Sequence, residues 1–146
     1  MRITYKGDYA LKAILDLALY YEKGVVTINE ISKRADIPLK FLEQVLLDLK
    51  RGGFVVSKRG KEGGYSLAKD PSKVTVGDVV RFIDGPVEPI ACIGKKYVGC
   101  NDVYKCVFRK IWQEVAQSTS LIVDNVTFAD LIKEVNINKT GFVYSI

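Results

Sequence analysis

The fold is decided by residues 31–70, which have the sequence ISKRADIPLKFLEQVLLDLKRGGFVVSKRGKEGGYSLAKD. Gly52-Gly53 is expected to end a helix over residues 38–51, and residues 54–57 and 65–68 are predicted to form two strands joined by a basic, glycine-rich loop. The stretch therefore predicts a helix followed by a β-hairpin. The helix is amphipathic, because its apolar residues recur about every 100° and share one face: Leu39, Leu42, Val45, Leu46 and Leu49.

The residues before this helix complete a helix-turn-helix. Positions 7–21 show the helical spacing of apolar residues and predict a first helix. Thr27 and Glu30 stand in the order of a capping box, in which two residues satisfy each other's backbone N–H groups, so a second helix is expected to begin there. Pro38 suits the start of the third helix because its missing N–H has no helical partner there. The predicted fold is mainly α, a winged helix-turn-helix with the hairpin as its small β wing.

The second half of the chain is predicted to be helical apart from one irregular segment. Helices are expected to begin near Thr75 and Thr127, and a helix of about 20 residues, reaching about 30 Å, is expected over residues 103–123. The tail shows no clear pattern. The chain is therefore divided into a DNA-binding domain (1–84), a cysteine-containing loop (85–106), the long helix with a short following helix (103–135) and the tail (136–146).

Composition limits the class of protein. A chain of 146 residues, 48% of them hydrophobic, supports one domain or a small domain with an oligomerising extension. No apolar run approaches the roughly 18 residues needed to cross a membrane, and the N-terminus lacks the apolar core of a signal peptide, so a cytoplasmic protein is expected. The sequence contains no histidine and no nucleotide or flavin loop motif, so an enzyme is not expected.

The polar face of the helix over residues 38–51 has side chains that can contact DNA. Glutamine can pair with adenine, glutamate can accept a hydrogen bond from cytosine, and lysine can reach guanine or phosphate. The net charge of +5 permits this role. A merely solvated face is the alternative, and the basic hairpin argues against it. Because one such module buries a modest interface, a homodimer on a two-fold related promoter site is expected. The predicted DNA contacts are Lys40, Glu43, Gln44, Lys58, Arg59 and Lys61.

The cysteines are confined to one short segment. They are Cys92, Cys100 and Cys106, spaced C-x7-C-x5-C. An odd number of clustered thiols favours metal or redox chemistry over a disulfide framework. Three thiolates leave a soft metal or an iron–sulfur cluster one ligand short. From the spacing alone, three states remain open: a cluster, a zinc ion bound by three thiolates and an aspartate, and thiols without metal.

Three stretches resemble the IscR/NsrR/RirA-type iron–sulfur winged-helix regulators of bacteria: MRITYKGDYAL at the N-terminus, the block over residues 31–70, and the cysteine segment, whose spacing is closer to the RirA type. The resemblance implies a homodimeric transcription factor, usually a repressor, with the helix over residues 103–123 in the dimer interface. The three cysteines would hold a cluster whose state, set by iron or cluster supply, redox conditions or nitric oxide, controls operator affinity. By position, Glu43 would contact a base and Arg59 would enter the minor groove.

The fourth cluster ligand departs from the IscR-type pattern. Those regulators use a histidine three residues beyond the third cysteine, where this chain has Arg109, a cation that cannot be a ligand. NsrR-type regulators use an aspartate near the start of the first helix, donated by the partner subunit, and Asp8 stands at the matching position. Asp8 could instead cap its helix. Solvent, Asp84, Glu88 and Asp102 are the other candidate ligands.

Three cysteine ligands and one oxygen ligand suit a [4Fe–4S] cluster, which we favour, and a [2Fe–2S] cluster is the second choice. The chain is therefore predicted to be a transcriptional regulator controlled by a cluster. The first alternative is a winged-helix regulator that senses thiol oxidation or zinc without a cluster. The second is an iron–sulfur electron carrier, for which a basic wing would have no use.

Overall fold

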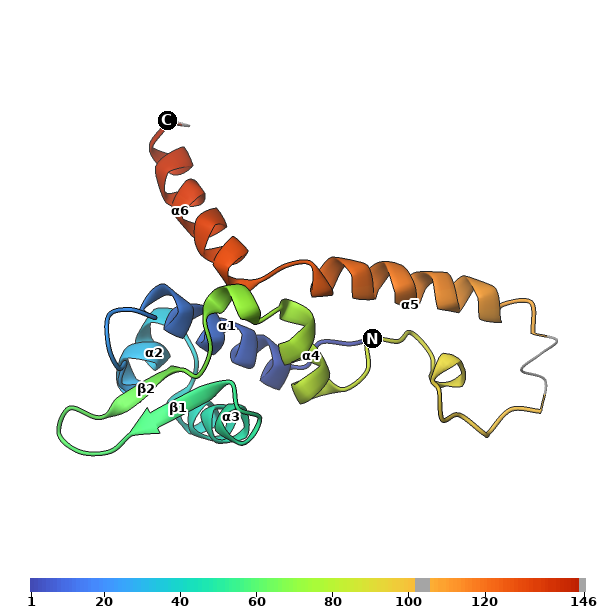
Figure 1. Ribbon diagram of the computed structural model, residues 1–146, viewed down its shortest axis with the longest axis horizontal. Coiled ribbons are helices and arrows are strands. Elements are labelled where there is room, and N and C mark those ends of the chain that lie inside the picture. The colour runs from blue at the N-terminus through green and yellow to red at the C-terminus, as the bar shows by residue number, and fades with distance from the viewer. Residues whose placement is uncertain (102–105, 145–146) are drawn as a thin grey trace.

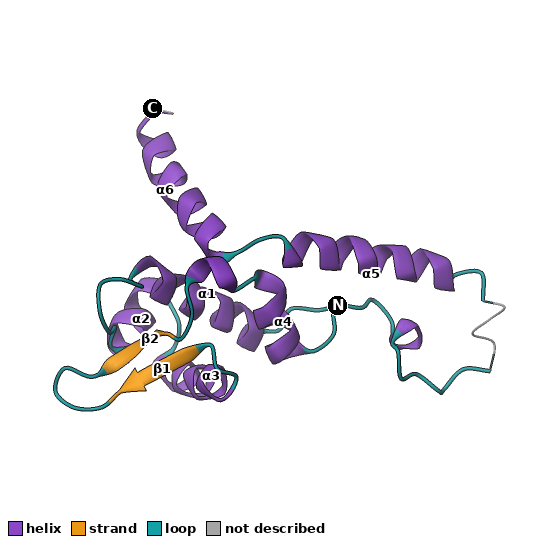
Figure 2. Ribbon diagram, in the orientation of Figure 1, coloured by secondary structure: helices purple, strands orange, loops and turns teal. Residues whose placement is uncertain are grey.

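The computed structural model describes residues 1–101 and 106–144, and the architecture is shown in Figure 1 and, by element type, in Figure 2. These residues form six α-helices, one two-stranded antiparallel hairpin and two short 3-10 turns. The elements in chain order are α1 (Tyr5–Leu19), α2 (Ile28–Ala35), α3 (Leu39–Arg51), β1 (Val55–Lys58), β2 (Gly64–Leu67), η1 (Pro71–Lys73), α4 (Val76–Asp84), η2 (Ala91–Ile93), α5 (Arg109–Asp124) and α6 (Phe128–Tyr144).

The core forms around α1, which contacts α2, α3, α4, α6 and β2. Its buried side chains include Ile14 and Leu17, and α6 adds the fully buried Phe128. The predicted apolar face of α3 is confirmed for Leu42, Val45, Leu46 and Leu49, which are all buried. Leu39 was expected on that face but is 41% exposed, because it is the first residue of the helix and lies beyond the core.

The helix-turn-helix is fixed by its caps and by one ion pair. The Thr27 hydroxyl accepts a hydrogen bond from the Glu30 N–H, and the Glu30 carboxylate accepts one from the Thr27 N–H, so the predicted capping box is present. Asp36 ends α2 in the left-handed conformation, with φ of 52°. The Arg34 guanidinium donates to both oxygens of the buried Asp16 at 2.9 and 3.0 Å and so joins α2 to α1.

The hairpin is the predicted wing. Val55 pairs with Leu67, and both side chains are buried, so the base of the hairpin is anchored in the core. Lys58 pairs with Gly64 at the outer end of the ladder, and the tip projects away from the body of the protein. The fold class, a mainly helical winged helix-turn-helix, is therefore confirmed.

The second half of the chain leaves this core and returns to it. The segments around Thr75 and Thr127 form an isolated antiparallel bridge. In it, the Val76 N–H donates to the Val126 carbonyl and the Phe128 N–H donates to the Val74 carbonyl. Between these points, α5 extends away from the body, and α6, which follows the bridge, projects at an angle to α5 (Figure 1). No residue of α5 is buried. None of the helices in the described residues has the length and hydropathy needed to cross a membrane.

The first helix spans Tyr5–Leu19 and not residues 7–21, and larger differences from the predicted boundaries lie in the second half of the chain. The long helix begins at Arg109, and residues 106–108 form a turn, whereas residues 103–105 lie outside the described part of the chain. The last helix continues to Tyr144, through most of the tail that had no assignment. There the Thr140 hydroxyl bonds back to the carbonyls of Asn136 and Ile137, so this polar residue adds to the helix without interrupting it.

Candidate functional site

The first candidate surface is the outer face of α3. Burial of its apolar side turns Lys40, Glu43 and Gln44 toward solvent, and all three are exposed. The Gln44 amide donates a weak hydrogen bond of 3.3 Å to Asp48, which leaves its other polar positions available. These three predicted contact residues therefore share one accessible surface of a single helix.

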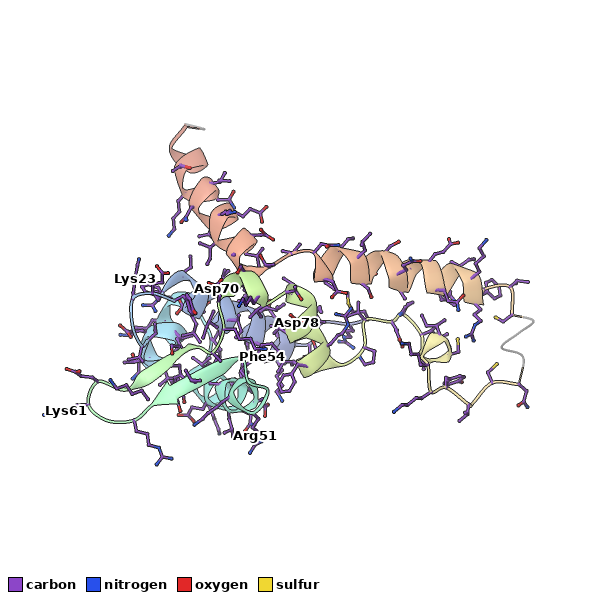
Figure 3. All side chains as sticks on the ribbon, viewed as in Figure 1. Lys23, Arg51, Phe54, Lys61, Asp70 and Asp78 are labelled. Atoms are coloured by element: carbon purple, nitrogen blue, oxygen red, sulfur yellow. The ribbon has the colours of Figure 1, made fainter. Side chains whose placement is uncertain are left out.

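The wing adds cations beside this helix. Lys58, Arg59 and Lys61 are exposed, and Lys61 lies at the wing tip in Figure 3. Gly60 has φ of 109°, a conformation that favours glycine. A Cβ atom at Gly63 would collide with the Lys58 carbonyl oxygen, so the tip can close only because this position is glycine. The glycines thus shape a narrow basic tip, as expected from the sequence.

Two hydrogen bonds join the wing to α3, and an aromatic contact joins it to α4. The Lys50 ammonium donates to the Ser57 hydroxyl at 2.7 Å, and the Phe54 N–H donates to the Leu49 carbonyl at 2.9 Å. The Phe54 ring packs on Phe82 of α4 with centroids 5.3 Å apart. A movement of α3 would therefore carry the wing with it.

The structure also reveals a contact that sequence reasoning missed, between the start of α1 and α3. The Lys6 ammonium lies 2.5 Å from the Asp48 carboxylate, whose side chain is only 17% exposed. This ammonium holds the pKa of the Asp48 carboxyl below its ordinary value. Tyr9 and Phe41 add an aromatic contact between the same two helices, with centroids 6.4 Å apart. The two charged residues are 42 positions apart, so no local signal in the sequence could have paired them.

The second candidate site is the cysteine segment. Cys92 lies in η2 and is partly buried, Cys100 is exposed, and Cys106 is partly buried just before α5. All three are free thiols. In the described residues, no three histidine, cysteine, aspartate or glutamate side chains are grouped closely enough to hold a metal ion. The three cysteines therefore lie in one segment, but their side chains are not grouped closely enough to share one metal ion.

Arg109, the residue at the histidine position of IscR-type regulators, contacts this segment twice. Its side-chain Nη1 donates to the Cys92 carbonyl oxygen at 3.0 Å. Its backbone N–H donates to the Cys106 carbonyl oxygen at 3.3 Å. The first and third cysteines are therefore both hydrogen-bonded to one residue through their backbones.

Asp8 is accessible and does not cap its helix. Thr4 is the N-cap of α1, and its hydroxyl accepts a hydrogen bond from the Gly7 N–H at 3.1 Å, so the capping alternative for Asp8 is wrong. The Asp8 carboxylate pairs with Lys12 at 2.7 Å and raises the pKa of Lys12. The Asp8 side chain is 46% exposed, and it borders a surface hollow of about 600 Å³ together with residues 2–5.

Two of the other proposed oxygen ligands, Asp84 and Glu88, lie in the described part of the chain, and both are partly buried. Asp84 accepts hydrogen bonds from the Thr4 N–H at 3.1 Å and from the Thr4 hydroxyl at 2.5 Å, so it supports the cap of α1. Gly7 makes room for this carboxylate, since a Cβ atom there would overlap it. Glu88 is partly buried near η2, and Asp102 lies outside the described residues.

The sequence model of the Rrf2 family, described as an iron-dependent transcriptional regulator, matches residues 3–134. The chain belongs to the Rrf2 family. The predicted resemblance is thereby confirmed, and IscR belongs to the same set of relatives. The IscR regulator of Yersinia pseudotuberculosis is 39% identical over 137 residues, which cover 94% of this chain and 82% of that protein. An rrf2-like HTH-type regulator of Rhodobacter capsulatus is 42% identical over 137 residues, covering 89% and 91% of the two chains.

Solved structures of Rrf2-type regulators share the fold. CymR, the global cysteine regulator of B. subtilis, superposes with a TM-score of 0.78 at 28% identity, covering 92% of this chain and 98% of CymR. T. potens IscR gives a TM-score of 0.74 at 30% identity, covering 92% and 88%. This Rrf2 chain is accordingly an IscR-like transcriptional regulator, and a DNA-binding role for α3 and the wing agrees with the activity of its relatives.

Proposed function

We propose that this Rrf2-family chain is a homodimeric repressor whose operator affinity is controlled by an iron–sulfur cluster. Cys92, Cys100 and Cys106 would supply three ligands, and Asp8 of the partner subunit the fourth. The observation that carries the proposal is the position of the three thiols, which follow a DNA-binding unit and directly precede a long exposed helix. Iron or cluster supply, redox conditions or nitric oxide would be the signal.

The donor set fits this cofactor. Three thiolates are suitable ligands for iron–sulfur clusters, and an aspartate oxygen can complete the coordination. A [4Fe–4S] cluster is favoured, with [2Fe–2S] as the second choice. Oxygen is a harder donor than sulfur, so the iron at this corner would be held less firmly and would react first. The bound cluster would supply this chemical sensitivity, and the protein would convert it into a change in DNA binding.

Dimerisation would use the exposed apolar side of α5. This helix has 16 residues and is about 24 Å long. A surface of this kind is unusual in an isolated subunit and is typical of a protein interface. The large exposed apolar residues of α5 are Ile111, Val115, Leu121 and Ile122.

The ion pair at the start of α1 would connect Asp8 with the proposed DNA-binding surface. Asp8 and Lys6 lie in the first turn of α1, and Lys6 is paired with Asp48 of α3. Release of Asp8 from the partner's cysteine segment would free this turn to shift, and the ion pair would pass the shift to α3. Because the wing is hydrogen-bonded to α3, the proposed DNA contacts of α3 and those of the wing would change together.

A thiol- or zinc-sensing regulator without a cluster is the second candidate. It is favoured by the similarity to CymR, whose structure is that of a global cysteine regulator. The two functions differ in what the purified protein contains. Purification without oxygen, followed by visible spectroscopy and analysis of iron, sulfide and zinc, distinguishes them. Brown protein with equal iron and sulfide supports the cluster, whereas zinc without sulfide would exclude it.

Glu43→Ala is expected to relax base discrimination in the operator. One good contact to a base edge is worth about 1–3 kcal/mol, so the loss at one base pair should be of that size, while binding to unrelated DNA stays unchanged or increases slightly. Fluorescence anisotropy with single-base variants of a palindromic promoter fragment measures it. Glu22→Ala removes an exposed carboxylate outside α3 and the wing and serves as the control. Equal loss of affinity for all sequences would contradict a base-contacting role.

Asp8→Ala is expected to give a cluster that is lost faster, by about tenfold or more, since even the supporting partners of metal ligands contribute 10–100-fold to affinity. The decay of visible absorbance after exposure to a chelator measures the rate. Lys12→Met removes the ion pair with Asp8 but keeps the carboxylate, and it should decay like the wild type. An unchanged spectrum and decay in Asp8→Ala would exclude Asp8 as a ligand.

A further inference from the structure

The Arg109 side chain reaches Cys92, which lies 17 residues earlier in the chain, and Arg109 is partly buried. As the first residue of α5, it binds the Cys106 carbonyl through its backbone N–H and the Cys92 carbonyl through its side chain. In the described part of the segment, the other hydrogen bonds of residues 91–101 are local turns, such as Gly94 N–H to Ala91 O at 3.0 Å and Tyr97 N–H to Gly94 O at 3.3 Å. Among the described residues 91–101, Arg109 therefore supplies the long-range hydrogen bond, whereas the Met1 ammonium donates to the Glu88 carbonyl nearer the start of the loop.

The chemistry of arginine suits a supporting role and excludes ligation. A guanidinium stays protonated and has five N–H donors but no acceptor, so it cannot bind iron. A hydrogen bond from a charged donor to a carbonyl is stronger than a neutral one. Its positive charge would also offset the negative charge of nearby thiolates. A residue with these properties can hold the cysteine backbone in place while leaving every thiol free to bind.

We propose that Arg109 is a positioning residue that closes the cysteine segment into a loop before any cluster is bound, and holds Cys92 near Cys106. A cysteine segment that is already closed into a loop loses less conformational entropy when a cluster binds. Cys100, which lies exposed between the two, would then be the cysteine that moves on binding. The role in cluster assembly rests on the proposed function, whereas closure of the loop does not.

Hydrogen exchange in the full-length, cluster-free protein tests the closure. In Arg109→Gln, the amides of Gly94 and Tyr97 should exchange about three- to tenfold faster, because a hydrogen bond to a charged group is lost from a partly exposed site. Arg109→Lys, which keeps the charge but not the fork of donors, should lie between Gln and wild type. Lys110→Gln removes the neighbouring exposed cation and should match the wild type. Unchanged exchange in Arg109→Gln, or equal acceleration in Lys110→Gln, would overturn the proposal.

Cluster assembly provides the second measurement. Arg109→Gln should take up iron and sulfide more slowly than wild type by a similar factor, with the same final absorbance, since all ligands remain. The melting temperature of each variant shows whether its winged helix is intact, and Arg109→Lys still decides the question if the glutamine variant is unstable. If the wild type binds no cluster, the proposed function fails, but the exchange experiment still decides the role of Arg109.

Discussion

Cys100→Ser protein purified without oxygen is expected to contain no iron and no sulfide, and to lack the visible bands that the proposed cluster would give the wild type. A serine hydroxyl is a much poorer ligand than a thiolate, and in the proposed site one of the four ligands is already an oxygen, from Asp8 of the partner subunit. A second oxygen ligand in place of a thiolate should therefore abolish the proposed cluster and not merely weaken it. Absorption spectroscopy with iron and sulfide analysis measures the result.

The control for this variant is a neighbouring change in the same loop. Tyr97 is 40% exposed, and Tyr97→Ser should leave the cluster content unchanged. Because Cys100 is itself exposed, Cys100→Ser should alter the stability of the cluster-free protein by no more than about 0.5 kcal/mol. A Cys100→Ser protein with full iron and sulfide content would show that the ligands lie elsewhere.

Phe128→Ala is expected to lower the free energy of unfolding by about 3–5 kcal/mol, a large part of the roughly 5–15 kcal/mol typical of a domain. Phe128 is fully buried, and its N–H bonds to the Val74 carbonyl where the chain returns to the core. The loss combines the transfer of a phenyl ring with the cavity that remains. Urea denaturation at a fixed protein concentration measures it.

Phe41→Ala is the matched control for this measurement. Phe41 is 61% exposed and contacts Tyr9 at the surface, so its removal should cost less than about 1 kcal/mol. An equally small loss in Phe128→Ala would mean that the C-terminal helix is not integrated with the core. In that case, the connection between α5 and the DNA-binding unit would be looser than the packing indicates.

The elements over residues 27–70 could be predicted from the sequence because their signals are local. A capping box, a glycine pair and two short strands each act within a few residues, and each is present where expected. The exposed positions of Lys40, Glu43 and Gln44 followed from the same helical period. Local chemistry was therefore sufficient to predict α2, α3 and the wing, and the exposure of the proposed DNA contacts.

The contacts that connect the candidate sites could not be predicted in this way. Arg34 pairs with Asp16, Lys6 with Asp48, and the Arg109 side chain with the Cys92 backbone. Each pair joins two elements, and its formation depends on tertiary packing, about which helical or strand periodicity contains no information. The same limit explains the start of α5. Val107 and Phe108 continue the apolar pattern of the helix, but they lie in a turn.

The ion pair between Arg81 and Asp124 joins the two ends of the region that contains the cysteines. The Arg81 Nη2 lies 2.9 Å from Asp124 Oδ2, so the end of α5 is tied to α4 at the point where the chain left the core. Gly77 allows this approach, because a Cβ atom there would overlap the Asp124 carboxylate. Residues 85–123 thus lie between two helix ends that this ion pair joins. Since the entropy of a closed loop changes only slowly with its length, evolution could lengthen or shorten the cysteine spacing without disturbing the DNA-binding unit. The same winged helix could therefore carry cysteine regions of different length and different sensing chemistry.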